Sequence, residues 1–272
     1  MKKIKKFIIS GFYFLRQIYK DRNVILTLSR RDFERQYIQN FFGLIWAILE
    51  PFALVMVLYL VFGVRFGDKT INGATYVEYV LVGYIVFGLF TSIQNLTSII
   101  KTHSFLLRKT DFKVASLPII GMLSNLMMHG ILVLVAIVIL LFNNNYPSFY
   151  WFQLIYYMFS LSMFLIGATW FTSSVFLFFP DIKNMLNILV RVMFFATPIF
   201  WTFDQFSDKV STVLKLNPLY YIATGYRDSL LYNKGFWEHP TLTIYFWSLT
   251  LIIMLIGLIV FRKLRPHFAD VV

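Results

Sequence analysis

Two charged side chains lie clearly inside apolar stretches of this chain. Glu50 stands directly before Pro51 in the run 43–63, and Arg191 stands in the run 184–202. A charge within a bilayer is costly, so it usually faces a cavity or a partner. Glu50 is therefore a candidate partner for Arg191 or for an arginine on the cytoplasmic side. Arg191 either meets a polar group in the membrane or extends its long side chain to the cytoplasmic surface.

Motifs that carry catalytic chemistry are missing from the sequence. It contains no cysteine, no phosphate-cradling G-x-x-x-x-G-K-[ST] loop, no H-E-x-x-H zinc motif and no G-x-S-x-G nucleophile motif. His103 and His129 stand apart from one another, so they form no paired set of metal ligands. We therefore expect no metal site, no cofactor and no catalytic residues.

The composition indicates what kind of protein has to position these charges. Of the 272 residues, 58% are hydrophobic, 19% aromatic and 14% charged, whereas a soluble domain has about 25% charged residues. These proportions are typical of an integral membrane protein, in which the long apolar runs cross the bilayer as α-helices. The formal net charge of +12 suits cytoplasmic loops beside anionic membrane lipids, and we expect no nucleic-acid partner.

Six apolar runs predict an all-α domain with six transmembrane helices over residues 43–262. The predicted spans are 43–63, 77–100, 115–142, 149–179, 184–202 and 241–261. Six spans leave both termini on one side, and that side carries 18 lysines and arginines against 6 on the other. The positive-inside rule therefore places both termini of this multi-pass protein in the cytoplasm.

Three further segments flank or interrupt the spans. Residues 1–42 are predicted to form cytoplasmic amphipathic or interface helices, since residues 1–19 combine an apolar stripe with lysines. A transit peptide or a disordered basic tail is the alternative for residues 1–19. Residues 214–232 are too polar to span and too apolar for an ordinary loop, which favours a re-entrant helical hairpin in the outer leaflet, broken before Pro218. Residues 263–272 form a cytoplasmic tail.

Four groups of residues occur in an order that resembles one known family. They are Arg31-Asp32 and Arg35-Gln36-Tyr37 ahead of Gly43, Trp46, Ala47, Pro51 and Phe62-Gly63; then Thr197-Pro198-Ile199-Phe200-Trp201; then Leu216-Asn217-Pro218-Leu219 with Gly225-Tyr226-Arg227-Asp228; and finally the basic stretch 261–270. From about Ser29 to its end, the chain resembles the permease subunits of ABC-2 type polysaccharide exporters. It departs from that pattern at Glu50, where a glutamine is often found.

This resemblance implies a function and partners. Such permeases form a homodimer, work with two separate cytoplasmic ABC ATPase subunits, and export a lipid-linked polysaccharide such as O antigen, teichoic acid or capsule. The chain would then lie in the cytoplasmic (inner) membrane of a bacterium, among membrane lipids, and ATP hydrolysis would belong to the partner subunit. Arg191 would meet the pyrophosphate of the lipid-linked substrate or extend to the cytoplasmic surface.

The resemblance also implies which residues serve coupling and gating. Force from the ATPase is expected to pass through a set of basic and apolar cytoplasmic residues, namely Arg31, Arg35, Leu106, Leu107, Arg108 and Asp111. The hairpin 214–232 is expected to form an external gate with Asn217, Pro218, Arg227 and Asp228. Within this gate, we expect Arg227 and Asp228 to stay near the membrane surface or to pair with one another.

An aromatic-lined channel suits a sugar polymer, because sugar rings have C–H faces that stack on aromatic side chains. The candidates inside the predicted spans are Tyr59, Tyr84, Phe87, Trp170, Phe194, Phe195 and Phe200. For each of them, contact with lipid or ordinary packing is the alternative. Two other functions remain open, an ABC-2 exporter of drugs or lipids and a membrane-bound polysaccharide-modifying acyltransferase. The lack of a paired acid and histidine counts against the acyltransferase.

Overall fold

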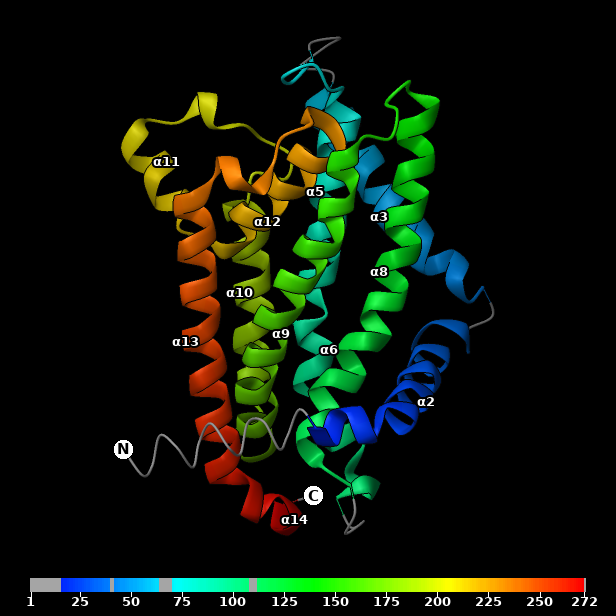
Figure 1. Ribbon diagram of the computed structural model, residues 1–272, viewed down its shortest axis with the longest axis vertical. Coiled ribbons are helices and arrows are strands. Elements are labelled where there is room, and N and C mark those ends of the chain that lie inside the picture. The colour runs from blue at the N-terminus through cyan, green and yellow to red at the C-terminus, as the bar shows by residue number, and fades with distance from the viewer. Residues whose placement is uncertain (1–15, 40–41, 64–69, 108–111, 272) are drawn as a thin grey trace.

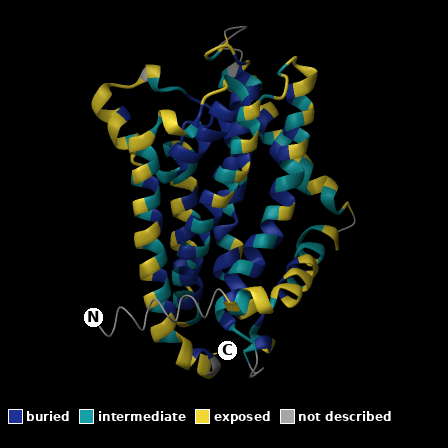
Figure 2. Ribbon diagram, viewed as in Figure 1, coloured by how far each residue is buried: buried dark blue, intermediate teal, exposed yellow. Residues whose placement is uncertain are grey.

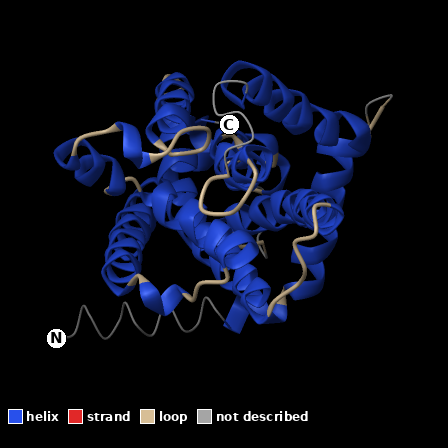
Figure 3. Ribbon diagram, turned by 90° about the horizontal axis from the view of Figure 1, so that it is seen from above, coloured by secondary structure: helices blue, strands red, loops and turns tan. Residues whose placement is uncertain are grey.

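The computed structural model describes residues 16–39, 42–63, 70–107 and 112–271, and within these ranges the chain is all-helical. The one other feature of regular structure there is an isolated bridge between Ile71 and Ala74. The long helices stand roughly side by side as a bundle (Figures 1 and 3). Of the predicted interface helix over residues 1–19, residues 1–15 lie outside the described residues. The all-α prediction is confirmed.

Five helical stretches among the described residues are long and apolar enough to cross a membrane. They are Leu44–Phe62, Tyr76–Thr97, Val114–Phe142, Phe149–Phe178 and Pro240–His267. They occupy the places of five predicted spans. At the place of the remaining one, 184–202, the structure has α10 (Ile182–Ala196), a helix of 15 residues that is about 22 Å long. A bilayer core is about 30 Å thick, so α10 is shorter than the predicted span.

The end of α10 follows from Pro198. A residue that precedes proline is forced out of the helical region, and Thr197 has φ −96° and ψ 135°. Residues 197–201 therefore continue in a non-helical conformation, whereas the sequence predicted that the helix would extend through them.

The first span begins and bends where its glycine and proline require it. Gly43 has φ 49° and ψ −127°, a conformation that side chains with a Cβ rarely adopt. It starts α3 (Leu44–Leu58), which contains Pro51 and continues as the π-helix η2 (Tyr59–Gly63). Pro51 lacks an N–H, so it weakens the helix at the point where Glu50 is exposed.

The second span is the centre of the bundle. Thr75 and Glu78 form a capping box at the start of α5 (Tyr76–Thr91), and the chain continues through α6 (Ile93–Thr97) and α7 (Ile99–Thr102). Within the most apolar 18 residues of each span, 78% are buried for Tyr76–Thr97 but only 17% for Leu44–Phe62. Figure 2 shows the same contrast between inner and outer helices. The first span therefore leaves most of its surface uncovered by its own chain.

Three long helices complete the bundle. They are α8 (Leu117–Phe142), α9 (Gln153–Phe178) and α13 (Pro240–Leu264). Gly167 of α9 and Gly257 of α13 face one another so closely that a Cβ on either would collide with the backbone of the other helix. Small residues allow this close approach of membrane helices.

Short elements gather at the two ends of the bundle, called upper and lower as in Figure 1. The upper end carries α11 (Asp208–Lys215), α12 (Pro218–Arg227) and the π-helix η7 (Asp228–Tyr232). The lower end carries α2 (Arg22–Phe33), the 3-10 helix η3 (Ser104–Leu106) and α14 (Phe268–Val271). One large core cluster lies in the middle and upper bundle, and a smaller one lies at the lower end around Ile100, Leu117 and Phe261.

Candidate functional site

A buried arginine holds the upper end together. Arg227 is only 3% exposed. Its Nε and Nη2 donate to the carbonyl oxygen of Tyr79 at 3.2 and 3.1 Å, and Nη2 also donates to the carbonyl oxygen of Ile199 at 3.1 Å. The guanidinium carbon lies 3.5 Å from the centre of the Tyr79 ring. Arg227 thus joins α12 to α5 and to the non-helical stretch 197–201.

Two tyrosines of α5 bind the same stretch. The carbonyl groups after the end of α10 have no helical donors, so other groups must satisfy them. The Tyr76 hydroxyl donates to the carbonyl oxygen of Phe200 at 2.8 Å. The Tyr79 hydroxyl lies within hydrogen-bond distance of the carbonyl oxygens of Pro198 and Trp201, at 3.2 and 3.0 Å. The conformation after Pro198 is therefore fixed by α5 and α12 together.

Asn217 and Pro218 lie between α11 and α12 and connect them to the stretch 197–201. The Asn217 side-chain oxygen accepts from the backbone N–H of Leu219 and caps α12, and Pro218 occupies the first turn. The Asn217 side-chain amide donates to the Thr197 hydroxyl at 2.8 Å. The sequence predicted a break before Pro218, and α11 and α12 do separate there, but α11 begins at Asp208, ahead of the predicted hairpin.

Of the two alternatives expected for Arg227 and Asp228, a position near the membrane surface or pairing with one another, the described residues show no ion pair between them. Asp228 is buried and lies 3.0 Å from Nε2 of His239. Burial raises the pKa of the Asp228 carboxyl, and His239 acts in the opposite direction. Both predicted gate charges are thus inside the upper end and are bound to different partners. The backbone carbonyls that bind Arg227 leave no signal in the sequence.

Five of the predicted channel aromatics lie together. Phe87 contacts Phe194 with ring centres 5.1 Å apart, and Phe194 contacts Phe195 at 5.3 Å and Phe200 at 5.5 Å. Tyr84 lies 6.5 Å from Phe87 at the edge of this group. We call these five residues the aromatic cluster. Phe195 is 66% exposed, so the cluster reaches the surface of α10.

The other two predicted aromatics lie elsewhere. Trp170 is buried in the lower core cluster, and its indole N–H donates to the carbonyl oxygen of Ala115 at 3.0 Å. Tyr59 is 41% exposed on η2 and shares no ring contact with the aromatic cluster among the contacts of the described residues. The structure adds Phe62, which the sequence analysis did not select and whose ring lies 5.2 Å from that of Phe200.

Glu50 and Arg191 are both exposed, on α3 and α10. No ion pair joins them within the described residues, so the sequence-based pairing is not what this chain forms by itself. Glu50 borders a cavity of about 160 Å³ that is also lined by Tyr84, Asn125 and His129. His129 is buried, and its Nδ1 has no hydrogen-bond partner among the described residues. The polar side chains of the first, second and third spans thus meet at one cavity.

At the lower end, one acidic side chain ties α2 to the loop after α7. The buried positions of α2 are Ile25, Ser29 and Asp32, which share one helix face. Asp32 lies 2.7 Å from Nη2 of Arg35 and 3.7 Å from Nε2 of His103. Asp32 thus places α2 in contact with the segment between α7 and α8.

Tyr37 makes a second connection from the same segment. It lies in the π-helix η1 (Glu34–Ile38), and its hydroxyl donates to the side-chain oxygen of Asn125 on α8 at 3.1 Å. Burial raises the pKa of the Tyr37 phenol to about 12, and Asp32 acts in the same direction. The phenol therefore keeps its proton and remains a hydrogen-bond donor.

The predicted coupling residues differ in how far they reach the surface. Arg31 and Arg35 are exposed, but Leu106 is buried and Leu107 is half-buried against the lower core cluster. Arg108 and Asp111 lie outside the described residues. Phe105, which the sequence analysis did not select, is 59% exposed. In the sequence it is simply one of three apolar neighbours, so only the fold distinguishes it.

Comparison with known proteins identifies the family. The family model described as ABC-2 type transporter matches residues 23–231. This chain belongs to the ABC-2 type transporter family. The resemblance inferred from the motifs is therefore confirmed. The match covers nearly all of α2, the spans through α9, and α12 with Arg227, whereas α13 and α14 lie beyond it.

Relatives within this family are similar along nearly their whole length. The chain is 25% identical to the O-antigen export system permease protein RfbA of Klebsiella pneumoniae, over 92% of this chain and 95% of that protein. It is 22% identical to the RfbA of Myxococcus xanthus, over 94% and 98%. It is also 22% identical to the polysialic acid transport protein KpsM of Escherichia coli, over 87% and 91%.

Proposed function

We propose that this protein is the permease subunit of a bacterial ABC transporter that exports a lipid-linked polysaccharide across the cytoplasmic membrane. The observation that carries the proposal is the similarity over 87–94% of the chain to permeases named for O-antigen and polysialic acid export. Such similarity leaves little of the chain for a different activity. Hydrolysis of ATP belongs to a separate ATPase subunit, because the sequence has no phosphate-cradling loop.

The aromatic cluster suits the proposed substrate. Phe87, Phe194 and Phe200 pack edge-to-face or tilted against each other, and Phe195 extends the group to the surface. Aromatic faces bind the C–H faces of sugar rings without selecting a sequence of sugars. Phe195 is the exposed member of the cluster, so it is the ring that a passing polymer would contact, while the buried Phe87 and Phe200 support it from the core.

A second copy of the chain completes the pathway. Glu50 and Arg191 are exposed on α3 and α10; α3 is otherwise apolar, and the half of α10 around Arg191 is apolar beyond Asn187. Charges on such surfaces usually face a partner or water rather than lipid. In a homodimer that joins these helices, Glu50, Arg191 and Phe195 border a channel between the subunits.

The membrane topology follows from the same arrangement. Together α10 and the stretch 197–201 form the fifth of six spans, and α11 and α12 form a helical pair that re-enters the outer leaflet at the upper end. The lower end then faces the cytoplasm, in agreement with the distribution of lysine and arginine. The upper end becomes the external gate, with Arg227 and Asn217 holding it in its resting conformation.

The lower end receives the ATPase subunits. Arg31 and Phe105 are exposed on α2 and η3, and Asp32 and His103 connect these two elements. A partner that moves either element therefore moves both. Leu106 has a structural role in this proposal, because it is buried in the chain's own lower core cluster.

Depletion of the protein in its bacterial host tests the function. The lipid-linked polymer should accumulate on the cytoplasmic side, and the amount of polymer at the cell surface should fall. A plasmid copy of the gene should restore the surface polymer, which excludes an effect on synthesis enzymes. Normal surface polymer in depleted cells would contradict the proposal. Retention of a drug or a free lipid, with the polymer unaffected, would indicate a different cargo.

A further inference from the structure

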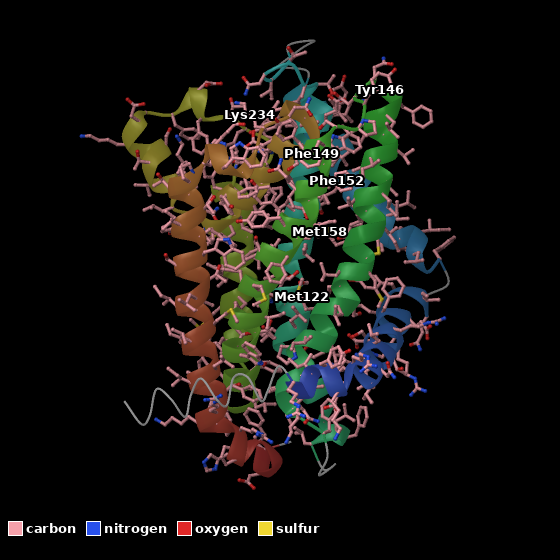
Figure 4. All side chains as sticks on the ribbon, viewed as in Figure 1. Met122, Tyr146, Phe149, Phe152, Met158 and Lys234 are labelled. Atoms are coloured by element: carbon pink, nitrogen blue, oxygen red, sulfur yellow. The ribbon has the colours of Figure 1, made fainter. Side chains whose placement is uncertain are left out.

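A cavity of about 470 Å³ lies at the upper end, between the start of α5, the stretch after α10, and the α12–η7 segment. Its volume falls within the range of about 300–1,000 Å³ that is usual for small-molecule sites. Lys234, one of its lining residues, marks this end of the molecule in Figure 4. The cavity shares no lining residue with the aromatic cluster, whose members lie on α5, on α10 and in the stretch 197–201.

Arg227 gives this cavity a buried hydrogen-bond donor. Its Nε and Nη2 are bound to backbone carbonyls of Tyr79 and Ile199. The remaining nitrogen, Nη1, has no hydrogen bond within the described residues, although the side chain as a whole is only 3% exposed. Arg227 lines the cavity, and Nη1 is the guanidinium nitrogen left free of the backbone carbonyls of Tyr79 and Ile199, so it is the donor that we assign to a bound molecule.

Other lining residues supply an acceptor and apolar rings. Asp204 is exposed and forms no hydrogen bond or ion pair in the described part of the chain. Phe203 and Tyr220 also line the cavity and contact one another at right angles, with ring centres 5.2 Å apart. A guanidinium donor, a carboxylate acceptor and aromatic rings together match the hydroxyl groups and C–H faces of a sugar ring.

The charges argue against a simple anion as the ligand. Arg227 and Lys234 line the cavity with positive charge, but Asp204 and Asp228 line it with negative charge. A small anion would gain attraction from the first pair and repulsion from the second. A molecule with many hydroxyl groups uses both kinds of group, as donor and as acceptor.

We propose that this cavity is a sugar-binding subsite, which holds one sugar unit of the polymer as it leaves the transporter. This inference rests on the proposed export function. The cavity borders residues 198 and 202–204, directly after α10, so a polymer that passes the aromatic cluster next reaches this surface. A unit held here would hinder return of the polymer into the channel between rounds of ATP hydrolysis.

Photo-crosslinking during export tests the subsite. A benzoylphenylalanine is placed at Phe203, which lines the cavity, and in a second variant at Phe206, three residues away, which does not. The host is fed a radiolabelled sugar and irradiated, and labelled permease is measured. We expect several-fold more polymer joined to position 203 than to position 206. The change Asp204→Ala should reduce the position-203 product several-fold, whereas Asp208→Ala, at another exposed aspartate nearby, should not.

The same cells report export separately, through the amount of labelled polymer at their surface. Normal export with equal crosslinking at both positions, or with a position-203 product that Asp204→Ala leaves unchanged, would overturn the subsite and leave the exporter function standing. Surface polymer that does not depend on the protein at all would overturn both.

Discussion

Replacement of Arg227 by methionine tests the role of the buried guanidinium. Methionine has a similar length and no donor, so Arg227→Met removes the hydrogen bonds to Tyr79 and Ile199 without removing much volume. The Tyr79 carbonyl lies within α5, but the Ile199 carbonyl lies in a non-helical stretch and loses a donor when the guanidinium is removed. A buried carbonyl without a donor costs about 1–3 kcal/mol, and a desolvated cation–π contact contributes about 2 kcal/mol.

These contributions, partly offset because a buried charge no longer has to be desolvated, give a loss of about 3 kcal/mol in stability. For a domain of 150–250 residues, 1 kcal/mol shifts the Tm by about 2–4 °C, so we expect a decrease of about 6–12 °C. The assay is thermal unfolding of the purified protein in lipid nanodiscs, with Arg191→Met as the control at an exposed arginine. Equal Tm values for the two variants would refute the role assigned to Arg227.

Three further predictions use matched pairs of variants. Gly83→Ala should lower the Tm, because a Cβ at this position collides with the Arg227 guanidinium and overpacking costs about 1–3 kcal/mol. Gly88→Ala on the same helix places its Cβ in open space and should leave the Tm unchanged. A lower Tm for Gly88→Ala alone would contradict this. Phe105→Asp should leave the Tm unchanged and weaken binding of the ATPase, measured by co-purification. Leu106→Asp should instead lower the Tm, because it buries a charge. If the stable Phe105→Asp variant binds the ATPase as well as the unaltered protein does, Phe105 is not part of the coupling surface. Phe195→Ala should leave the Tm unchanged and reduce the amount of polymer at the cell surface. Phe87→Ala, at a buried position, should instead cost about 3–5 kcal/mol in stability. Normal export by Phe195→Ala would mean that Phe195 does not border the pathway.

The length and apolarity of the runs were sufficient to predict most of the fold. Most observed spans begin and end within a few residues of the predicted ones, as do Leu44–Phe62, Val114–Phe142 and the start of Pro240–His267. A chain that crosses the membrane must satisfy its backbone groups internally, so an apolar run of that length forms a helix. The length of the helix predicted over residues 184–202 was overestimated. Its apolar composition continues past Thr197, but Pro198 ends α10 and the carbonyls beyond it bind to α5.

The candidate site was predictable in type more than in detail. Aromatic residues of the second and fifth predicted spans do lie together, but Trp170 belongs to the lower core because its indole binds the Ala115 carbonyl. Leu106 and Phe105 are equally apolar in the sequence, and only the packing of η3 on the lower cluster shows that Leu106 is the buried one. Contacts to backbone carbonyls, such as those of Arg227, depend on tertiary structure and have no counterpart in residue types.

Reconstituted transport is the most direct test of the central claim. The permease and its ATPase are placed together in liposomes with labelled lipid-linked polymer, and a glycosidase on one side measures the polymer that has crossed the membrane. We predict transfer only when both subunits and ATP are present, and no ATP hydrolysis by a permease preparation free of ATPase. Transfer of the polymer without the permease, or ATP hydrolysis by the permease alone, would contradict the account.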